Sequence, residues 1–189
     1  MFDFKELFVF DLANNHQGDI NHALNIVNMI GKVTKKYKCK GGFKLQFRDL
    51  DTFIHKDFIN DESNPNIKRF LSTRLSWNEF FEIKSAIKNS DMISICTPFD
   101  EASVDKIIEM DFEIIKVASC SANDWPLMEK ISTSGKPVIV STGGLTINEI
   151  DQVVSFFEHK GVDFSLMHCV SIYPSSIEHV QVGFVRKLK

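Results

Sequence analysis

The sequence predicts an α/β protein whose strands all run parallel. Short apolar runs alternate with longer amphipathic segments about six times along the 189 residues. Capping signals mark where several of the amphipathic segments begin, and polar side chains follow the apolar runs. Strands separated by helices must run parallel, because each crossover returns the chain to the same end of the sheet. Two architectures fit this pattern, an open doubly wound sheet and a (β/α)₈ barrel.

The apolar runs are short and rich in Val, Ile, Leu and Phe, which is typical of strands buried on both faces. They cover residues 7–13, 42–47, 92–97, 112–119, 136–142 and 163–170. No G-x-G-x-x-G follows the first run, which weakens the doubly wound, dinucleotide-binding alternative.

The segments between the runs have helical periodicity. Helices are expected over about 20–37, from 76 onward, and over 101–110, 124–134 and 146–159. Asp19 is an expected N-cap, the S/T-x-x-E capping boxes begin at Ser76 and Thr146, and Gly161 is expected to end the last helix. Segment 48–75 is polar and mixed in charge, so we expect an extended loop with local helix.

Composition excludes several classes of protein. The net charge of −3 gives no overall basic surface, so no nucleic-acid partner is expected. The four cysteines form no C-x-x-C pair, which predicts reduced thiols rather than a zinc cage. No apolar run approaches the roughly 20 residues that span a bilayer, and the N-terminus does not resemble a signal peptide. We therefore expect a cytoplasmic protein of one domain with no membrane partner.

Polar residues gather where each predicted strand ends. In parallel α/β folds the loops at the carboxyl ends of the strands carry the active site. The residues that we expect at this rim are Asp11, His16, Lys44, Gln46, Thr97, Lys116, Ser119, Ser141, Ser171 and Tyr173.

Two lysines within apolar strands are the most informative of these residues. Lys44 and Lys116 are costly to bury unless each is paired. Either each amine pairs with a core acid, or the two project into one cavity and bind a phosphate or carboxylate. Hydroxyls and backbone N–H groups of the "STGG" turn at 141–144 would add donors for the anion.

Three other side chains have more than one interpretation. Asp11 is a general base, an acceptor for a substrate hydroxyl, or a buried partner for Lys44. His16 either lines the site or bonds a backbone carbonyl in an Asn-rich turn. His168 is expected to be a satisfied core histidine rather than a ligand.

Taken together, the motifs resemble the sialic acid synthase (N-acetylneuraminate synthase) family. The matching stretches occur in family order: "FVFDLANNHQGD", "FKLQF", "CTPFD", "IIKVASCSANDWPLMEKI", "GKPVIVSTGG" followed by "TINEI", and "MHCVSIYPSS". The resemblance implies a (β/α)₈ barrel that condenses phosphoenolpyruvate with an N-acetylated amino sugar such as N-acetylmannosamine. The products are a nine-carbon 2-keto sugar acid and phosphate.

The resemblance also implies roles for individual residues. Asp11, Lys44 and Lys116 fall at catalytic positions, and Asp11 stands where the family has a glutamate that touches the sugar. The phosphoenolpyruvate-binding positions match Lys44, Thr97, Lys116, Ser119, Ser141, Ser171 and Tyr173, with His16 and Gln46 also lining the substrate site. A divalent metal, Mn²⁺ or Mg²⁺, is expected to polarise the aldehyde.

The departures from the family pattern lie mostly on the sugar side. Asp11 and Ala13 replace the family's Glu-x-Gly, Ser171 replaces an asparagine, and Cys120 and Ser121 stand where a glutamate is usual. A related amino sugar, as in the pseudaminic or legionaminic acid branches, is therefore an alternative to N-acetylmannosamine.

The length predicts an incomplete barrel, because a full one needs eight strands and about 250 residues. We expect residues 1–189 to form a partial synthase barrel that stops before the later strands. The metal-binding histidines and the family's C-terminal antifreeze-like domain are then expected to lie outside this chain. Uncovered strand edges predict a homo-oligomer or a poorly stable isolated chain.

Two alternatives to a synthase remain open. One is a non-catalytic, truncated relative that binds a small anion or acts in assembly. The other is a different phosphoenolpyruvate-condensing or aldolase-type barrel in which Lys116 forms a Schiff base.

Overall fold

The computed structural model describes residues 1–59, 61 and 63–188. It divides into two compact units, Lys5–Glu113 and a second unit made of Met1–Phe4 with Ile114–Lys189. Each unit is built from parallel strands joined by helices, as the alternation of apolar and amphipathic segments predicts.

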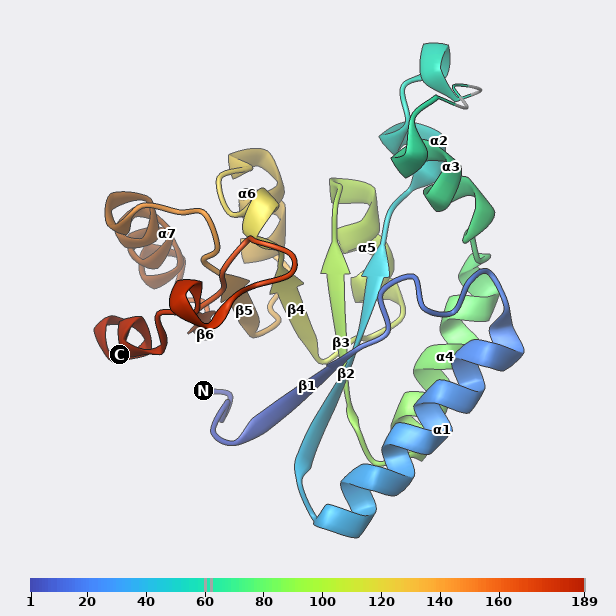
Figure 1. The fold of residues 1–189 in the computed structure, drawn as a ribbon, viewed down its shortest axis with the longest axis horizontal. Coiled ribbons are helices and arrows are strands. Elements are labelled where there is room, and N and C mark those ends of the chain that lie inside the picture. The colour runs from blue at the N-terminus through green and yellow to red at the C-terminus, as the bar shows by residue number, and fades with distance from the viewer. Residues whose placement is uncertain (60, 62, 189) are drawn as a thin grey trace. The chain divides into compact units, whose positions relative to one another are not determined.

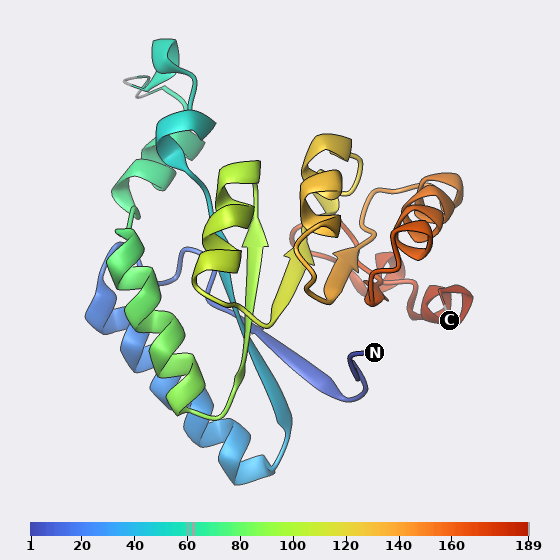
Figure 2. The ribbon, with the colours of Figure 1, turned by 180° about the vertical axis from the view of Figure 1, so that it is seen from behind.

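The Lys5–Glu113 unit holds strands β1 (Leu7–Asp11), β2 (Lys40–Phe47) and β3 (Ile93–Pro98). The register places Asp11 opposite Lys44 and Gln46 opposite Thr97. Helices α1 (Ile20–Tyr37) and α4 (Trp77–Asn89) lie side by side along this sheet in both views (Figures 1 and 2), and α5 (Glu101–Glu109) follows β3. Four polar side chains expected at the rim thus come from three neighbouring strands.

The two faces of β2 differ in chemistry. Phe43, Leu45 and Phe47 are fully buried, and the ring of Phe47 packs against Trp77 at 5.1 Å and Phe112 at 5.4 Å between ring centroids. Since side chains alternate along a strand, Lys44 and Gln46 point to the other face. The apolar face fixes the strand in the core and thereby fixes the direction of the polar face.

Segment 48–75 contains the local helix that its sequence predicts. It forms α2 (Leu50–Phe53), a 3₁₀ turn (Lys56–Phe58) and α3 (Pro65–Ser72). Residues 60 and 62 of this predicted loop lie outside the described residues. The bidentate ion pair of Arg74 with Asp51, at 3.0 and 2.7 Å, joins the segment's end to its beginning.

The second unit repeats the same strand–helix pattern. Its elements are β4 (Ile114–Val117), α6 (Trp125–Ser132), β5 (Val138–Ser141), α7 (Ile147–Lys160) and β6 (Phe164–Met167), with 3₁₀ turns at Ser119–Ser121, Ile177–His179 and Val182–Lys187. β4 pairs with β5, and β5 pairs with β6, both in parallel.

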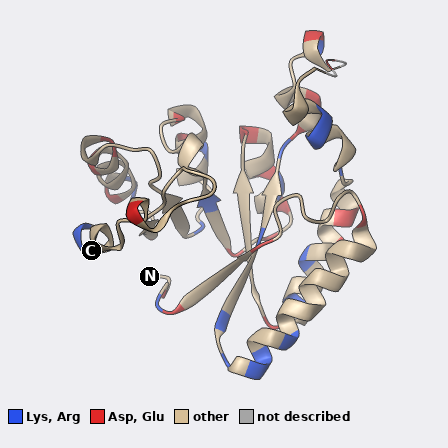
Figure 3. Cartoon of the chain, in the orientation of Figure 1, with Lys and Arg blue, Asp and Glu red and all other residues tan. Residues whose placement is uncertain are grey.

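The predicted helix ends are confirmed. The carboxylate of Asp19 accepts the backbone N–H groups of residues 21 and 22, and both capping boxes form in full at Ser76 and Thr146. Gly161 ends α7 in the left-handed conformation with φ 67°. Figure 3 shows basic residues in blue toward the C-terminal end of α1, where Lys35 and Lys36 complement the helix dipole.

The prediction that the strands are buried on both faces is wrong for two of them. The strands β4 and β5 are wholly buried, but β1 and β6 are only partly buried, and Phe8 of β1 is 58% exposed. These two strands stand at the two ends of the strand order, where a neighbouring strand covers only one edge. Position in the sheet, rather than the apolar run itself, decides how deeply a strand is buried.

The fold class is that of an incomplete (β/α)₈ barrel. Six parallel strands follow one another in chain order, with no reversal of the kind that defines a doubly wound sheet. All four cysteines are free thiols. None of the helices in the described ranges is long and apolar enough to cross a membrane.

Candidate active site

Lys44 and Asp11 form an ion pair at the polar face of β2. The Nζ atom of Lys44 lies 2.8 Å from Oδ1 of Asp11, and the two residues face each other in the register of β1 and β2. The side chain of Lys44 is 11% exposed whereas that of Asp11 is 46% exposed. Asp11 therefore pairs with Lys44, as one interpretation predicted, but its carboxylate is partly exposed rather than buried.

Thr97, on the neighbouring strand β3, has a buried hydroxyl. It stands opposite Gln46 in the register of β2 and β3, and it is 2% exposed. Among the described residues no hydrogen-bond partner reaches its Oγ1 atom. Buried hydroxyls are almost always bonded in native proteins, so an unpaired one opposite Gln46 indicates a place where a ligand supplies the partner.

His16 is buried, and its ring accepts a hydrogen bond. Its Nδ1 atom accepts a hydrogen bond from the backbone N–H of Gly18 at 3.2 Å, in place of the bond to a carbonyl that one interpretation predicted. Burial lowers the pKa of His16, although the nearby carboxylate of Glu79 acts in the opposite direction. In the neutral ring with Nδ1 as acceptor, Nε2 carries the hydrogen and is a donor.

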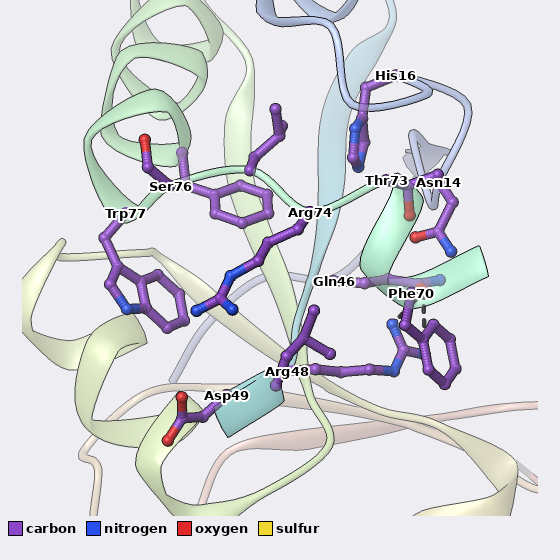
Figure 4. A pocket seen from close by; sticks show the side chains of 13 residues that line it. Asn14, His16, Gln46, Arg48, Asp49, Phe70, Thr73, Arg74, Ser76 and Trp77 are labelled. Carbon is purple, nitrogen blue, oxygen red and sulfur yellow. Dashed lines mark hydrogen bonds between the residues drawn. The ribbon is translucent and has the colours of Figure 1, made fainter. Parts of the chain in front are cut away.

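A pocket of about 430 Å³ opens beside His16 and Gln46, within the Lys5–Glu113 unit (Figure 4). Its polar lining also includes Asn14, Arg48 and Arg74, and its walls include Phe70, Leu75, Trp77 and Phe80. Neither arginine was among the predicted site residues. A strand period of two, continued from Lys44 and Gln46 to Arg48, is the sequence signal that would have found the first.

In the second unit, Lys116 and Ser141 form a hydrogen-bonded cluster. Lys116 is 5% exposed, and its Nζ atom donates to the Oγ atom of Ser141 and to the carbonyl oxygen of Val117, the latter at 2.7 Å. The thiol of Cys169 also donates to the Ser141 hydroxyl, at 3.2 Å. With its oxygen accepting twice, the hydroxyl of Ser141 has its own hydrogen left to donate.

The turn after β5 brings further donors to this cluster. The hydroxyl of Ser119 accepts the backbone N–H of Gly143 at 3.1 Å. A Cβ atom at Gly143 would lie 2.9 Å from Oγ of Ser119 and would clash with Oγ of Ser171. The hydroxyls of Ser119 and Ser171 thus both lie against the backbone of Gly143.

None of the residues of the "MHCVSIYPSS" motif from His168 to Ser175 is buried. Tyr173 is 92% exposed, so the predicted substrate contact has no support from the fold of its own unit. His168 is half-buried, and its Nε2 atom lies 2.9 Å from the carbonyl oxygen of Val180. The prediction that His168 is satisfied is confirmed, although it lies at the edge of the core rather than inside it.

Lys44 and Lys116 belong to different units, so their shared cavity stays a prediction. No three His, Cys, Asp or Glu side chains converge in the part of the chain that the structure describes. The described His, Cys, Asp and Glu side chains therefore do not by themselves form a site that fits a divalent metal.

Comparison with known proteins places these features in a family. The NeuB family model matches residues 29–189. The N,N'-diacetyllegionaminic acid synthase of Campylobacter jejuni is 25% identical, over 98% of this chain and 57% of its own length. This chain spans about half the length of the curated relatives it matches.

Two solved structures are similar over nearly the whole chain. A protein of Chromobacterium violaceum, assigned to spore coat polysaccharide biosynthesis, is 43% identical with a TM-score of 0.94, over 97% of this chain and 55% of that one. The N-acetylneuraminic acid synthetase of Leptospira borgpetersenii is 26% identical with a TM-score of 0.83, over 97% and 60%.

Proposed function

Because this chain belongs to the NeuB family, we propose that it forms the phosphoenolpyruvate-binding part of a synthase. The proposed reaction joins phosphoenolpyruvate to the aldehyde of an N-acylated amino sugar. With one water molecule consumed, it gives a nine-carbon 2-keto sugar acid and inorganic phosphate. N-acetylmannosamine and related hexosamines are the candidate sugars.

The observation that carries the proposal is the cluster around Lys116. A nearly buried ammonium, the hydroxyls of Ser141 and Ser119 and the crowded turn at Gly143 come from two successive strand ends, those of β4 and β5. Such a set of fixed donors suits a phosphate or carboxylate better than a neutral ligand. Phosphoenolpyruvate carries both anionic groups.

Lys44 and Asp11 have complementary proposed roles. By their positions in the family motifs, Lys44 and Thr97 are proposed to bind phosphoenolpyruvate as well, Lys44 through its ammonium and Thr97 through its buried hydroxyl. The partly exposed carboxylate of Asp11 accepts a hydroxyl of the sugar. We also propose that Ser171 and Tyr173 contact phosphoenolpyruvate. This part of the proposal rests only on their positions in the family motif.

The test uses the complete protein, with phosphoenolpyruvate, an N-acylated hexosamine and Mn²⁺, the metal that the family resemblance implies. Phosphate release is measured for the wild type and for Lys116→Met, which keeps the side-chain length and removes the charge. We expect kcat/KM for phosphoenolpyruvate to fall by about a hundredfold or more. Lys160→Met removes an exposed lysine of the same unit that pairs with Glu129, and it should stay near the wild-type value.

Two results would overturn the proposal. One is a complete protein that releases no phosphate with any such sugar. The other is a Lys116→Met protein that binds phosphoenolpyruvate in calorimetry as tightly as the wild type. Phosphoenolpyruvate binding without turnover would instead support a non-catalytic, anion-binding relative.

A further inference from the structure

The amide of Gln46 has its orientation set by Arg48. Both terminal nitrogens of the Arg48 guanidinium donate to Oε1 of Gln46, at 3.4 and 3.5 Å (Figure 4). A guanidinium carries only donors, so the Gln46 amide must turn its oxygen, and not its NH₂ group, toward Arg48. The Nε2 hydrogens are therefore what Gln46 offers to a molecule in the pocket that it lines.

Arg48 is itself held by aromatic rings. Its guanidinium carbon lies 3.7 Å from the ring centroid of Phe99, 4.5 Å from that of Phe70 and 6.0 Å from that of Phe53. These rings come from the residue after β3, from α3 and from α2. Stacking of a guanidinium on aromatic faces is favourable and restricts its plane. The orientation of Arg48 is thus fixed by contacts that do not involve Gln46.

We propose that Arg48 is a positioning residue that makes Gln46 a hydrogen-bond donor to an oxygen acceptor of the amino sugar. The inference rests on the proposed function, and it adds a specificity rule. A sugar with a hydroxyl or carbonyl oxygen at this point satisfies the Nε2 group, whereas an analogue that lacks the oxygen leaves a desolvated donor unpaired.

The first experiment measures the kinetics of the complete protein with Arg48→Met and Arg48→Lys. Methionine keeps an apolar stem among the rings, and lysine keeps the charge but lacks the planar pair of donors. In both variants we expect KM for the sugar to rise about tenfold, because one hydrogen bond to the sugar is then poorly oriented. We expect kcat and KM for phosphoenolpyruvate to stay within about twofold.

A double-mutant cycle separates positioning from a general loss of structure. In a Gln46→Leu background, Arg48→Met should have no further effect on KM for the sugar, because Arg48 acts through Gln46. Gln46→Glu keeps a partner for Arg48 but removes the donor, so it should weaken sugar binding as much as Gln46→Leu. Additive effects of the two substitutions, or a Gln46→Glu protein with normal KM, would overturn the inference.

A spectroscopic measurement keeps this test independent of turnover. In ¹⁵N-glutamine-labelled protein, the Gln46 side-chain NH₂ signal is assigned by its loss in Gln46→Leu. Its order parameter should fall toward that of an exposed side chain in Arg48→Met. An unchanged order parameter would contradict the positioning role even if the wild type proved inactive, whereas inactivity alone would count only against the proposed function.

Arg69→Met is the matched control. Arg69 lies in the same loop segment, with its guanidinium carbon 5.2 Å from the Phe70 ring and its Nη2 atom bonded to Asn66. It is exposed and lies outside the lining of the pocket. Neither KM for the sugar nor the Gln46 signal should change in this variant.

Discussion

Gly143 shows how a single residue shapes the cluster around Lys116 and Ser141. Its φ angle does not require glycine, unlike that of its neighbour Gly144 at 79°. The requirement comes from space, because the hydroxyls of Ser119 and Ser171 occupy the region where a Cβ atom would lie. The absent side chain lets two hydroxyls approach the backbone together.

Gly143→Ala should therefore weaken phosphoenolpyruvate binding without unfolding the protein. The clashing atoms are the ends of short side chains, which can rotate away at modest cost. We expect calorimetry to show a Kd for phosphoenolpyruvate raised roughly tenfold or more, with a melting temperature near that of the wild type. Gly183→Ala is the control, since its Cβ would meet no atom within 4 Å. Equal affinity in Gly143→Ala and wild type would contradict this role.

At the scale of elements, β2 and α4 together shape the pocket of the Lys5–Glu113 unit. The odd-numbered side chains of β2, from Phe43 to Phe47, pack into the core, and so the even-numbered polar side chains face the other way. Helix α4 begins at the pocket, where Ser76, Trp77 and Phe80 line the wall. Its capping box fixes that first turn.

Ser76→Ala should destabilise the protein through this capping box. The Ser76 hydroxyl accepts the backbone N–H of Glu79, and the Glu79 carboxylate accepts the N–H and hydroxyl of Ser76 at 2.7 Å. These bonds also lower the pKa of Glu79. Loss of an N-cap costs about 1 kcal/mol in the free energy of unfolding, measurable by urea denaturation.

Ser85→Ala is the comparison on the same helix. The hydroxyl of Ser85 bonds the carbonyl of Phe81 within α4, where alanine has the better helix propensity. This variant should be as stable as the wild type or slightly more stable. An equal loss of stability in Ser76→Ala and Ser85→Ala would contradict a specific stabilising role for the N-cap.

At the scale of the whole molecule, the strands at the ends of the strand order leave apolar surface exposed. Phe8 on β1 is 58% exposed, and all four residues of β6 are only partly buried. Exposed apolar edges of sheets favour pairing with another chain. We expect the 189-residue chain to associate in solution, with an average mass that rises with concentration in sedimentation equilibrium.

Phe8→Thr tests the cause of that association. Threonine suits a strand and removes the exposed ring, so the variant should shift toward the monomer. Tyr37→Thr removes a ring that is 69% exposed at the end of α1, away from a strand edge, and should leave the association unchanged. The prediction would be refuted if the wild-type chain stayed monomeric while its concentration was raised at least about tenfold through the micromolar range.

Much of the fold could be predicted because its signals are local. The capping residues Asp19, Ser76 and Thr146 and the terminator Gly161 act within a few residues of their own positions. The alternation of side chains along β2 likewise predicts a common face for its polar residues from a few adjacent positions. Arg48 was missed because the predicted apolar run stops at residue 47, although the alternation continued by one residue points to it. Two of its aromatic partners, Phe70 and Phe99, come from distant segments that no short motif joins.

The amino-acid order by itself determined the strand–helix repeat, the helix ends and the membership of the NeuB family. Periodicity, caps and motifs each depend on residues that are close together in the sequence. Only the tertiary structure decided which groups pair: Asp11 with Lys44, Cys169 and Lys116 with Ser141, Arg48 with Gln46. It also decided that Phe8 stays exposed. Hydrogen bonds, ion pairs and burial depend on distances between atoms, and folding alone brings residues far apart in sequence to bonding distance.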